Sequence, residues 1–246
     1  MIGDNYTNNF LYKLLSIFPK ENLNTFNIVQ IGANDGKTND PIYHWVMDSL
    51  NLTSILLIEP QEDALRLLKS NYSSHPNCKI FKGAVGSNEL ISLFRIKEEF
   101  HSNYRGIIAN GITSSNRDYV LKKIKRNLLI SENQNPELFI EEIKIRSLPL
   151  KSIIDKLAFL MPIHLLQIDT EGYDDICIYN SNLDEFKPKI INYEFVHLNT
   201  ERINKLHFYL QNKGYKIIRW TSEDECALLD ANHYNQALNI SQIQYY

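Results

Sequence analysis

The segment NIVQIGANDG, residues 27–36, contains an apolar run that ends at a glycine. A continuous run of Val and Ile residues is typical of a strand buried on both faces, as in a parallel sheet covered by helices. Gly32 and Gly36 follow the run, and glycine lets the backbone turn sharply and approach a ligand closely. A helical pattern begins near residue 41. This stretch therefore predicts a strand, a ligand-binding turn and a helix.

A second apolar run, SILLIE at residues 54–59, ends in an acidic residue, Glu59. In doubly wound folds a carboxylate at the end of the second strand binds the two ribose hydroxyls of a nucleotide. A glycine turn alone is a weak signal, since any strand-to-helix connection can use one. The turn and Glu59 together predict a ligand that contains a nucleoside.

The glycine turn lacks the features that bind phosphates. Asn34 stands where the dinucleotide fingerprint Gly-x-Gly-x-x-Gly has its second glycine, and the complete Walker pattern is absent. S-adenosylmethionine has a ribose and an adenine but no pyrophosphate, so it suits this turn best. We therefore expect S-adenosylmethionine as the cofactor, with NAD as the disfavoured alternative.

The length and composition of the chain limit the classes of protein to which it can belong. The 246 residues are enough for one large α/β domain, so we expect a single domain over residues 1–246. The formal charge of -3 gives no basic surface for nucleic acid, and the basic run 122–126 is typical of a solvated helix face, with a phosphate- or membrane-binding patch as the alternative. Three widely spaced cysteines indicate reduced thiols in a cytoplasmic protein. No apolar run reaches the roughly 18 residues of a membrane span, and nothing predicts an oligomeric state.

The rest of the chain alternates strand and helix patterns, which predicts parallel strands joined by right-handed crossovers. We expect strands at residues 27–32, 54–59, 78–83, 91–96, 140–146, 163–169, 189–195, 215–220 and 225–229. We expect helices at residues 9–18 (within a leading segment 1–26), 41–51, 61–73, 117–127, 150–157, 174–179 and 200–213. The last two strands resemble an antiparallel hairpin at the edge of the sheet.

Residues 98–137 break this rhythm. They are polar and carry few strand or helix signals before residue 117. A segment this long inside a domain is usually a functional lid or a disordered loop. Its side chains, such as Tyr104 and Arg105, are compatible with stacking on a sugar and hydrogen bonding to it. We expect an insert that binds the substrate accepting the methyl group.

Polar or glycine residues follow five of the predicted strands. In an open α/β sheet, ligands bind beyond the carboxyl ends of the strands. His164 begins its strand and is expected at the opposite rim. The rule places the following residues at one common edge: 32–36, 59, 83–86, 169–171 and 194–197.

Five motifs occur in a fixed order between residues 27 and 230. They are VQIGANDG (29–36), LLIEP (56–60), GAVG (83–86), SLPLKSIID (147–155) and LLQIDTEGYDD (165–175). In these motifs the chain resembles the FkbM-type methyltransferases, a class I S-adenosylmethionine-dependent family. The resemblance implies a Rossmann-like, doubly wound sheet of seven mostly parallel strands, with helices on both faces and an antiparallel C-terminal hairpin at one edge. It also implies methyl transfer, usually to a hydroxyl oxygen, and family members commonly act on sugars or polyketides.

The resemblance implies roles around the methionine part of the cofactor. Gly32, Ala33, Asn34 and Gly36 are expected to line it, with backbone amides near its carboxylate. Asp169 is expected near the sulfonium or the ammonium group, where a negative charge is favourable. An ordinary strand-end cap is the alternative for Asp169.

The resemblance also implies roles around the adenosine part. Glu59 is expected to accept hydrogen bonds from both ribose hydroxyls. Pro60 and Gln61 are expected to flank the adenine, and Ala84 and Val85 to form its other wall.

An alcohol acceptor must lose its proton as the methyl group arrives, and a base with a pKa near ambient pH serves best. Histidine meets this condition, so His197 is the first candidate for the base, with His101 of the insert as an alternative. Glu194 is a second candidate, either as a base or as a residue that orients the acceptor. Asp169 completes the predicted catalytic group.

A metal ion is the other means of activating a hydroxyl. Asp169 and Glu194 would suit Mg²⁺, since carboxylates are preferred ligands of this hard ion. Two carboxylates do not complete a coordination shell, so we expect no metal site.

These inferences converge on one function. We expect an S-adenosylmethionine-dependent methyltransferase that methylates a hydroxyl of a sugar, a glycan or another polar metabolite. The alternatives are a non-catalytic cofactor-binding or scaffolding module of a polysaccharide-assembly system and, less favoured, an NAD-dependent oxidoreductase.

Overall fold

A computed structural model describes residues 6–17, 25–105, 109, 111–129 and 134–243 of the chain. The predicted leading helix is present in shorter form as α1, Phe10–Leu15, which Asn9 caps by accepting hydrogen bonds from the N–H groups of Leu11 and Tyr12. Residue 18, the predicted end of this helix, lies outside the described residues. Among the described residues, no helix has both the length and the apolar character required to cross a membrane.

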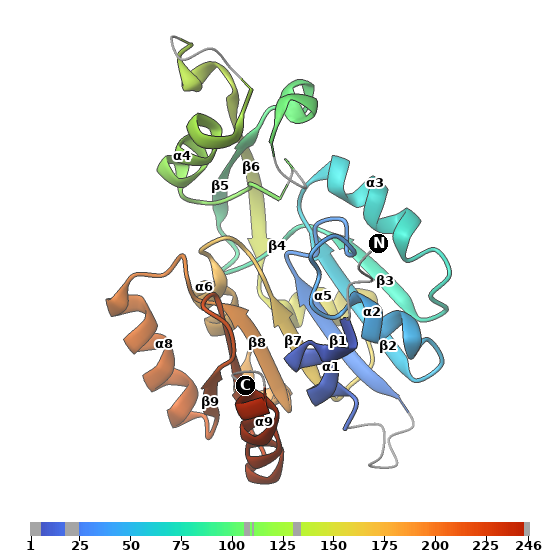
Figure 1. Cartoon of the computed structure of the whole chain (residues 1–246). Helices are drawn as coiled ribbons and strands as arrows, with labels where there is room; N and C mark the ends of the chain where they lie inside the picture. The colour runs from blue at the N-terminus through green and yellow to red at the C-terminus, as the bar shows by residue number, and fades with distance from the viewer. Residues whose placement is uncertain (1–5, 18–24, 106–108, 110, 130–133, 244–246) are drawn as a thin grey trace.

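A seven-stranded sheet forms the centre of the molecule (Figure 1). Its strand order is β3-β2-β1-β7-β8-β10-β9. Five neighbouring strands, from β3 to β8, run parallel, and β10 is antiparallel to both β8 and β9. This confirms the predicted mostly parallel, doubly wound sheet with an antiparallel C-terminal hairpin. The strands are β1 Phe26–Ile31, β2 Thr53–Glu59, β3 Cys78–Lys82, β7 Leu165–Ile168, β8 Ile190–Glu194, β9 Lys216–Arg219 and β10 Asp224–Leu228.

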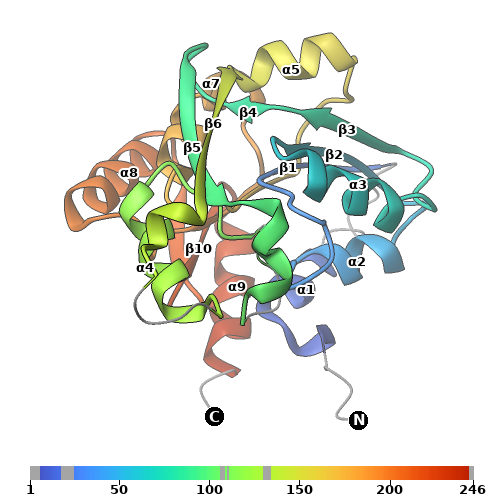
Figure 2. The same cartoon turned by 90° about the horizontal axis from the view of Figure 1, so that it is seen from above.

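Helices cover both faces of this sheet, as Figure 2 shows. Alternate residues of β1 serve opposite faces: Val29 and Ile31 pack on one side, and Ile28 packs on the other. This explains why the strand is apolar throughout. The first face is covered by α5 Leu150–Leu157, α6 Asp174–Tyr179, α7 Leu183–Phe186 and α8 Thr200–Asn212. The second face is covered by α1, α2 Tyr43–Asp48, α3 Glu62–Asn71 and α9 Ala231–Ile243.

Helix α9 is an element that the sequence analysis did not predict. Its segment contains Asn232, Asn235 and Asn239, and asparagine favours turns over helix interiors. The helix packs on α1 and β9, and Ala237 is fully buried there. Tertiary packing therefore outweighs weak local propensity in this segment.

A second, three-stranded sheet rises from the carboxyl edge of the first sheet. It contains β4 Ala84–Val85, β5 Leu90–Ile96 and β6 Ile140–Leu148, in the order β4-β6-β5. Strands β5 and β6 form a long antiparallel ribbon, and β5 confirms the predicted strand at residues 91–96. Between them lie η3 Glu98–Asn103, α4 Arg117–Asn127 and η4 Pro136–Leu138. We call residues 90–148 the cap.

The cap has a hydrophobic core of its own. Ile96 of the ribbon packs with Val120 and Ile124 of α4 and with Phe139. Figure 1 shows the ribbon and α4 projecting together beyond the carboxyl ends of the parallel strands. The described part of the predicted insert is therefore a folded unit placed over the edge at which ligands bind.

Gly32 occupies the point where β1 ends between β2 and β7. Its φ is +78°, and an added Cβ atom would lie 1.8 Å from the backbone oxygen of Asp169. Its N–H group donates to the oxygen of Ile58 at 2.9 Å. The glycine therefore allows three strand ends to meet.

We expect Gly32→Ala to lower the free energy of unfolding by about 3 kcal/mol or more, because it adds a steric clash to the strain of a left-handed backbone. Gly214→Ala is the matched control, since Gly214 has a φ of +90° but no close backbone neighbour. Gly214→Ala should lower the free energy of unfolding only by the strain of the left-handed backbone, about 1–2 kcal/mol. Urea unfolding of both variants measures the difference, and equal losses would contradict this account of Gly32.

Candidate functional site

A cavity of about 410 Å³ opens at the carboxyl edge of the large sheet, beneath the cap. Cavities of this size are typical of small-molecule and cofactor sites. The structure brings together at this cavity all but one of the residues that were predicted to bind the cofactor: Gly32, Ala33, Asn34, Glu59, Pro60, Gln61, Ala84, Val85 and Asp169.

Gly36 is the exception, because it does not line the cavity. A Cβ atom at Gly36 would lie 2.4 Å from Cδ1 of Leu68 and 2.7 Å from a ring carbon of Tyr72. The residue therefore faces α3, and its φ of +67° serves the packing of the turn against that helix. The second glycine of the turn positions the loop without lining the cavity.

Glu59 ends β2 and joins two turns. Its Oε2 accepts a hydrogen bond from the N–H of Asn34 at 2.8 Å, and its Oε1 accepts one from the N–H of Gln61 at 2.9 Å. Only 3% of the residue is exposed. Burial raises the pKa of Glu59 to about 7, although the two N–H groups partly oppose this shift. A carboxylate oxygen accepts more than one hydrogen bond, so both oxygens have capacity left for ligand hydroxyls.

The turn after β1 offers a buried acceptor that lacks a donor. Asn34 has a φ of +46°, which asparagine tolerates better than most residues. Among the described residues, no group donates to its buried Oδ1 atom. Buried polar atoms nearly always have a partner, so this oxygen is suited to a donor on a ligand.

The charges around the cavity favour a cationic ligand. Arg105 is the one basic side chain among the described residues that line it. The lining carboxyl groups belong to Asp40, Glu59, Asp169 and Glu171. Such a lining suits a sulfonium and an ammonium group and opposes a polyphosphate.

Asp169 follows β7 at the centre of this edge. Its side chain is exposed to the cavity but lies deep in the protein. This deep position, followed by the negative charges of Glu171 and Asp174, raises the pKa of Asp169 well above its usual range. A nearby cation would favour the charged form of Asp169.

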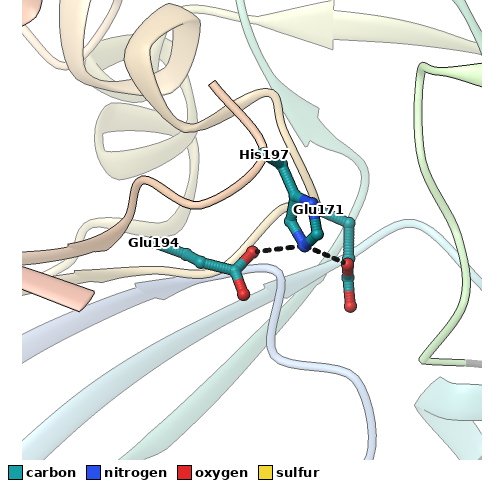
Figure 3. A group of neighbouring side chains, drawn as sticks. All are labelled: Glu171, Glu194 and His197. Carbon is teal, nitrogen blue, oxygen red and sulfur yellow. Dashed lines mark ion pairs between the residues drawn. The ribbon is translucent and has the colours of Figure 1, made fainter. Parts of the chain in front are cut away.

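His197 and Glu194, the two other predicted catalytic residues, do not line the cavity. Figure 3 shows them grouped with Glu171. The Nε2 atom of His197 lies 3.1 Å from Oε2 of Glu171 and 3.3 Å from Oε2 of Glu194. Burial and the charges of Asp169 and Glu171 raise the pKa of Glu194 above its usual range. These three side chains form what we call the acid–histidine group.

Glu171 is the residue that the sequence analysis missed. It lines the cavity, whereas the sequence analysis placed it at the common edge of the sheet without giving it a role. Its φ of +52° is unusual for a residue other than glycine. A signal was available in the sequence, since Glu171 stands two residues after Asp169 at the same strand end.

His101, the alternative base, lies elsewhere. Its Nε2 atom is 3.0 Å from the backbone oxygen of Ile96, and its Nδ1 atom is 3.7 Å from Oδ2 of Asp63. It does not line the cavity. The cap therefore holds His101 away from the edge where the predicted site residues meet.

The acid–histidine group also has the spacing of metal ligands. One ligand atom from each of Glu171, Glu194 and His197 lies within 4.8 Å of the others. Asp169, considered with Glu194 for Mg²⁺, is not part of this group. The same spacing suits proton transfer, because both distances to Nε2 are near hydrogen-bond length.

No curated protein matches the chain. A solved structure similar to it is a precorrin-6y C5,15-methyltransferase from Geobacter metallireducens, with 10% identity, a TM-score of 0.43, and 90% of this chain and 87% of that chain covered. Another is fibrillarin from Aeropyrum pernix with natively bound S-adenosyl-L-methionine, with 10% identity, a TM-score of 0.43, and 90% of this chain and 76% of that chain covered. A third is an S-adenosylmethionine-dependent methyltransferase from Aquifex aeolicus, with 6% identity, a TM-score of 0.40, and 91% of this chain and 92% of that chain covered.

The family comparison is decisive. The model of the methyltransferase FkbM domain matches residues 30–217, which is most of the chain. The matched range includes the glycine turn, Glu59 and the acid–histidine group. The chain therefore belongs to the FkbM methyltransferase family, as its motifs predicted, and S-adenosylmethionine is its cofactor.

Proposed function

We propose that this protein transfers the methyl group of S-adenosylmethionine to a hydroxyl oxygen of a sugar, a glycan or another polar metabolite. One observation carries the proposal: the residues predicted to bind the cofactor line one cavity, and the acid–histidine group reaches the same cavity through Glu171. The first would bind the methyl donor, and the second would take up the proton that a hydroxyl acceptor must lose.

The residues of the sheet fit the cofactor. Glu59 would accept hydrogen bonds from the two ribose hydroxyls, and Asn34 offers an oxygen without a donor. Ala84 and Val85 supply an apolar wall for the adenine. Asp169 would lie near the positive charge of the cofactor, which supplies an activated methyl group. This donor set is the one expected for a cationic nucleoside.

The cap would bind the acceptor. Tyr104, Arg105, Thr113 and Asn127 of the predicted insert line the same cavity as the cofactor residues. An aromatic ring and several hydrogen-bonding groups suit a polar, ring-containing acceptor such as a sugar. We therefore propose that residues 98–137 are an acceptor-binding insert and that the whole chain works as one methyltransferase domain.

His197 would be the final acceptor of the hydroxyl proton. Its ring is close to Glu194 as well as Glu171, and the positive charge that the ring gains would favour the ionised form of both carboxyl groups, which would stabilise that charge. Alignment of donor and acceptor in one cavity would supply much of the rate, since such positioning is worth roughly 7–11 kcal/mol. The family assignment favours this chemistry over the NAD-dependent alternative.

We expect Glu59→Gln to weaken S-adenosylmethionine binding by roughly 10- to 100-fold, because hydrogen bonds to a charged group contribute about 1.5–3 kcal/mol. In the unchanged protein, affinity should rise with pH until Glu59, with a pKa of about 7, is ionised. The glutamine variant should lose this pH dependence. Titration calorimetry measures both effects.

Glu62→Gln is the control for this experiment, because Glu62 is the next acidic residue along the chain and its side chain is 57% exposed. Its affinity for the cofactor should equal that of the unchanged protein. If Glu59→Gln also bound the cofactor normally at every pH, the assignment of Glu59 to the ribose would be wrong.

We expect His197→Gln to lower kcat by roughly 10²- to 10⁴-fold, the usual contribution of a proton-transfer group. Cofactor affinity should stay the same, since His197 does not line the cavity. Release of S-adenosylhomocysteine with a panel of sugar acceptors measures turnover. His44→Gln is the control, because His44 stacks on Tyr6 at the surface. Full turnover in His197→Gln would remove the histidine from the mechanism.

Treatment with EDTA is expected to leave methyl transfer unchanged, because the acid–histidine group is assigned to a proton. Activity before and after dialysis against the chelator tests this expectation. Loss of activity that Mg²⁺ or Mn²⁺ restores would reassign Glu171, Glu194 and His197 as metal ligands.

A further inference from the structure

Glu171 separates His197 from the cavity. Of the acid–histidine group, only Glu171 is a lining residue. An acceptor hydroxyl in the cavity therefore meets the carboxyl group of Glu171 before it meets the ring of His197. We propose that Glu171 is a catalytic residue that takes the proton from the acceptor hydroxyl and passes it to His197. This inference rests on the proposed function.

The two oxygens of Glu171 have different surroundings. Oε2 accepts a hydrogen bond from the hydroxyl of Tyr119 at 2.6 Å and lies 3.1 Å from Nε2 of His197. No described residue forms a hydrogen bond with Oε1. The side chain is 23% exposed. One oxygen is thus held against the histidine, and the other is available to the acceptor.

The backbone holds Glu171 in this position. The hydroxyl of Ser114 donates to the backbone oxygen of Glu171 at 2.6 Å. The next residue, Gly172, has a φ of +101° and lies against the side chain of His197, where an added Cβ atom would be 3.2 Å from the Cβ of the histidine. A left-handed conformation at a residue other than glycine costs energy and is concentrated at functional sites. This turn therefore aims the carboxyl group toward the cavity.

The proton and the electrons balance along this route. As the acceptor oxygen bonds to the methyl carbon, the carbon–sulfur bond breaks and its electron pair stays on sulfur. The hydroxyl proton moves to Oε1 of Glu171, rotation of the carboxyl group about its Cγ–Cδ bond brings this proton to His197, and the proton then moves to Nε2. Glu194, with Oε2 at 3.3 Å from Nε2, stabilises the charged ring. Solvent accepts the proton afterwards and restores neutral His197.

Tyr119 is a positioning residue for this relay. It belongs to α4 of the cap, its hydroxyl holds Glu171, and its ring meets the ring of His197 edge to face with a centroid distance of 4.6 Å. Tyr119 therefore joins the cap to both partners of the proton transfer. Correct placement of the cap and completion of the relay depend on the same side chain.

The test compares Glu171→Gln, His197→Gln and the double variant. Glu171→Gln should lower kcat at least 100-fold and leave the Kd for S-adenosylhomocysteine within twofold. Because the two residues act in sequence on one proton, the double variant should be no slower than the slower single variant. If the loss of kcat in the double variant equalled the product of the two single losses, the relay would be overturned. Full turnover in Glu171→Gln would overturn it as well.

A second comparison separates the role of Tyr119 from general support of the cap. Tyr119→Phe should lower kcat about tenfold with little change in KM for the acceptor and should shift the pH profile of kcat, because the phenyl ring keeps its packing but cannot hold Glu171. Asp118→Asn, an exposed change on the same helix, is the control and should match the unchanged protein. An unaltered pH profile and kcat in Tyr119→Phe would contradict the positioning role.

The failure of the relay and the failure of the proposed function give different results. If the unchanged protein transferred no methyl group to any hydroxyl acceptor, the proposed function would fail. If it did transfer one and His197→Gln were impaired while Glu171→Gln were not, only the relay would fail.

Discussion

The carboxylate of Glu59 provides the contact on which the site depends. It accepts one backbone N–H from the turn after β1 and another from the turn after β2. The backbone oxygen of the same residue accepts a hydrogen bond from Gly83, at the end of β3, at 3.2 Å. Three parallel strands are thereby connected at their carboxyl ends. Burying this charge is costly, and such a cost is characteristic of functional sites.

Two separate structural units complete the cavity that Glu59 helps to shape. The large sheet supplies the acidic lining that suits a cationic methyl donor, and the cap supplies the aromatic and polar groups that suit an acceptor. The acid–histidine group lies where these units meet, since Tyr119 of the cap contacts both Glu171 and His197. Under the proposed function, the donor site would keep its geometry while changes in the cap altered which acceptor binds.

The parts of the fold that the sequence predicted best are those with strong local signals. Helices α5 and α6 have the predicted bounds, and α4 was predicted within the polar insert. The carboxyl-end rule also placed Glu59 and Asp169 at one edge, because parallel strands leave no other place for them. The cap core was not predictable, since it joins residues as distant as Ile96 and Phe139. The position of the Glu171 side chain and the packing of Gly36 each depend on a positive φ angle, which the sequence pattern does not reveal.

A crystal structure of the protein with S-adenosylhomocysteine tests the role of Glu59 most directly. Both ribose hydroxyls should lie within about 3 Å of the carboxyl oxygens of Glu59, a normal hydrogen-bond distance. The adenine should lie against Ala84 and Val85, and the sulfur should face the cap. A ligand with its ribose bound by other residues, or a Glu59 side chain turned out of the cavity, would contradict the central claim.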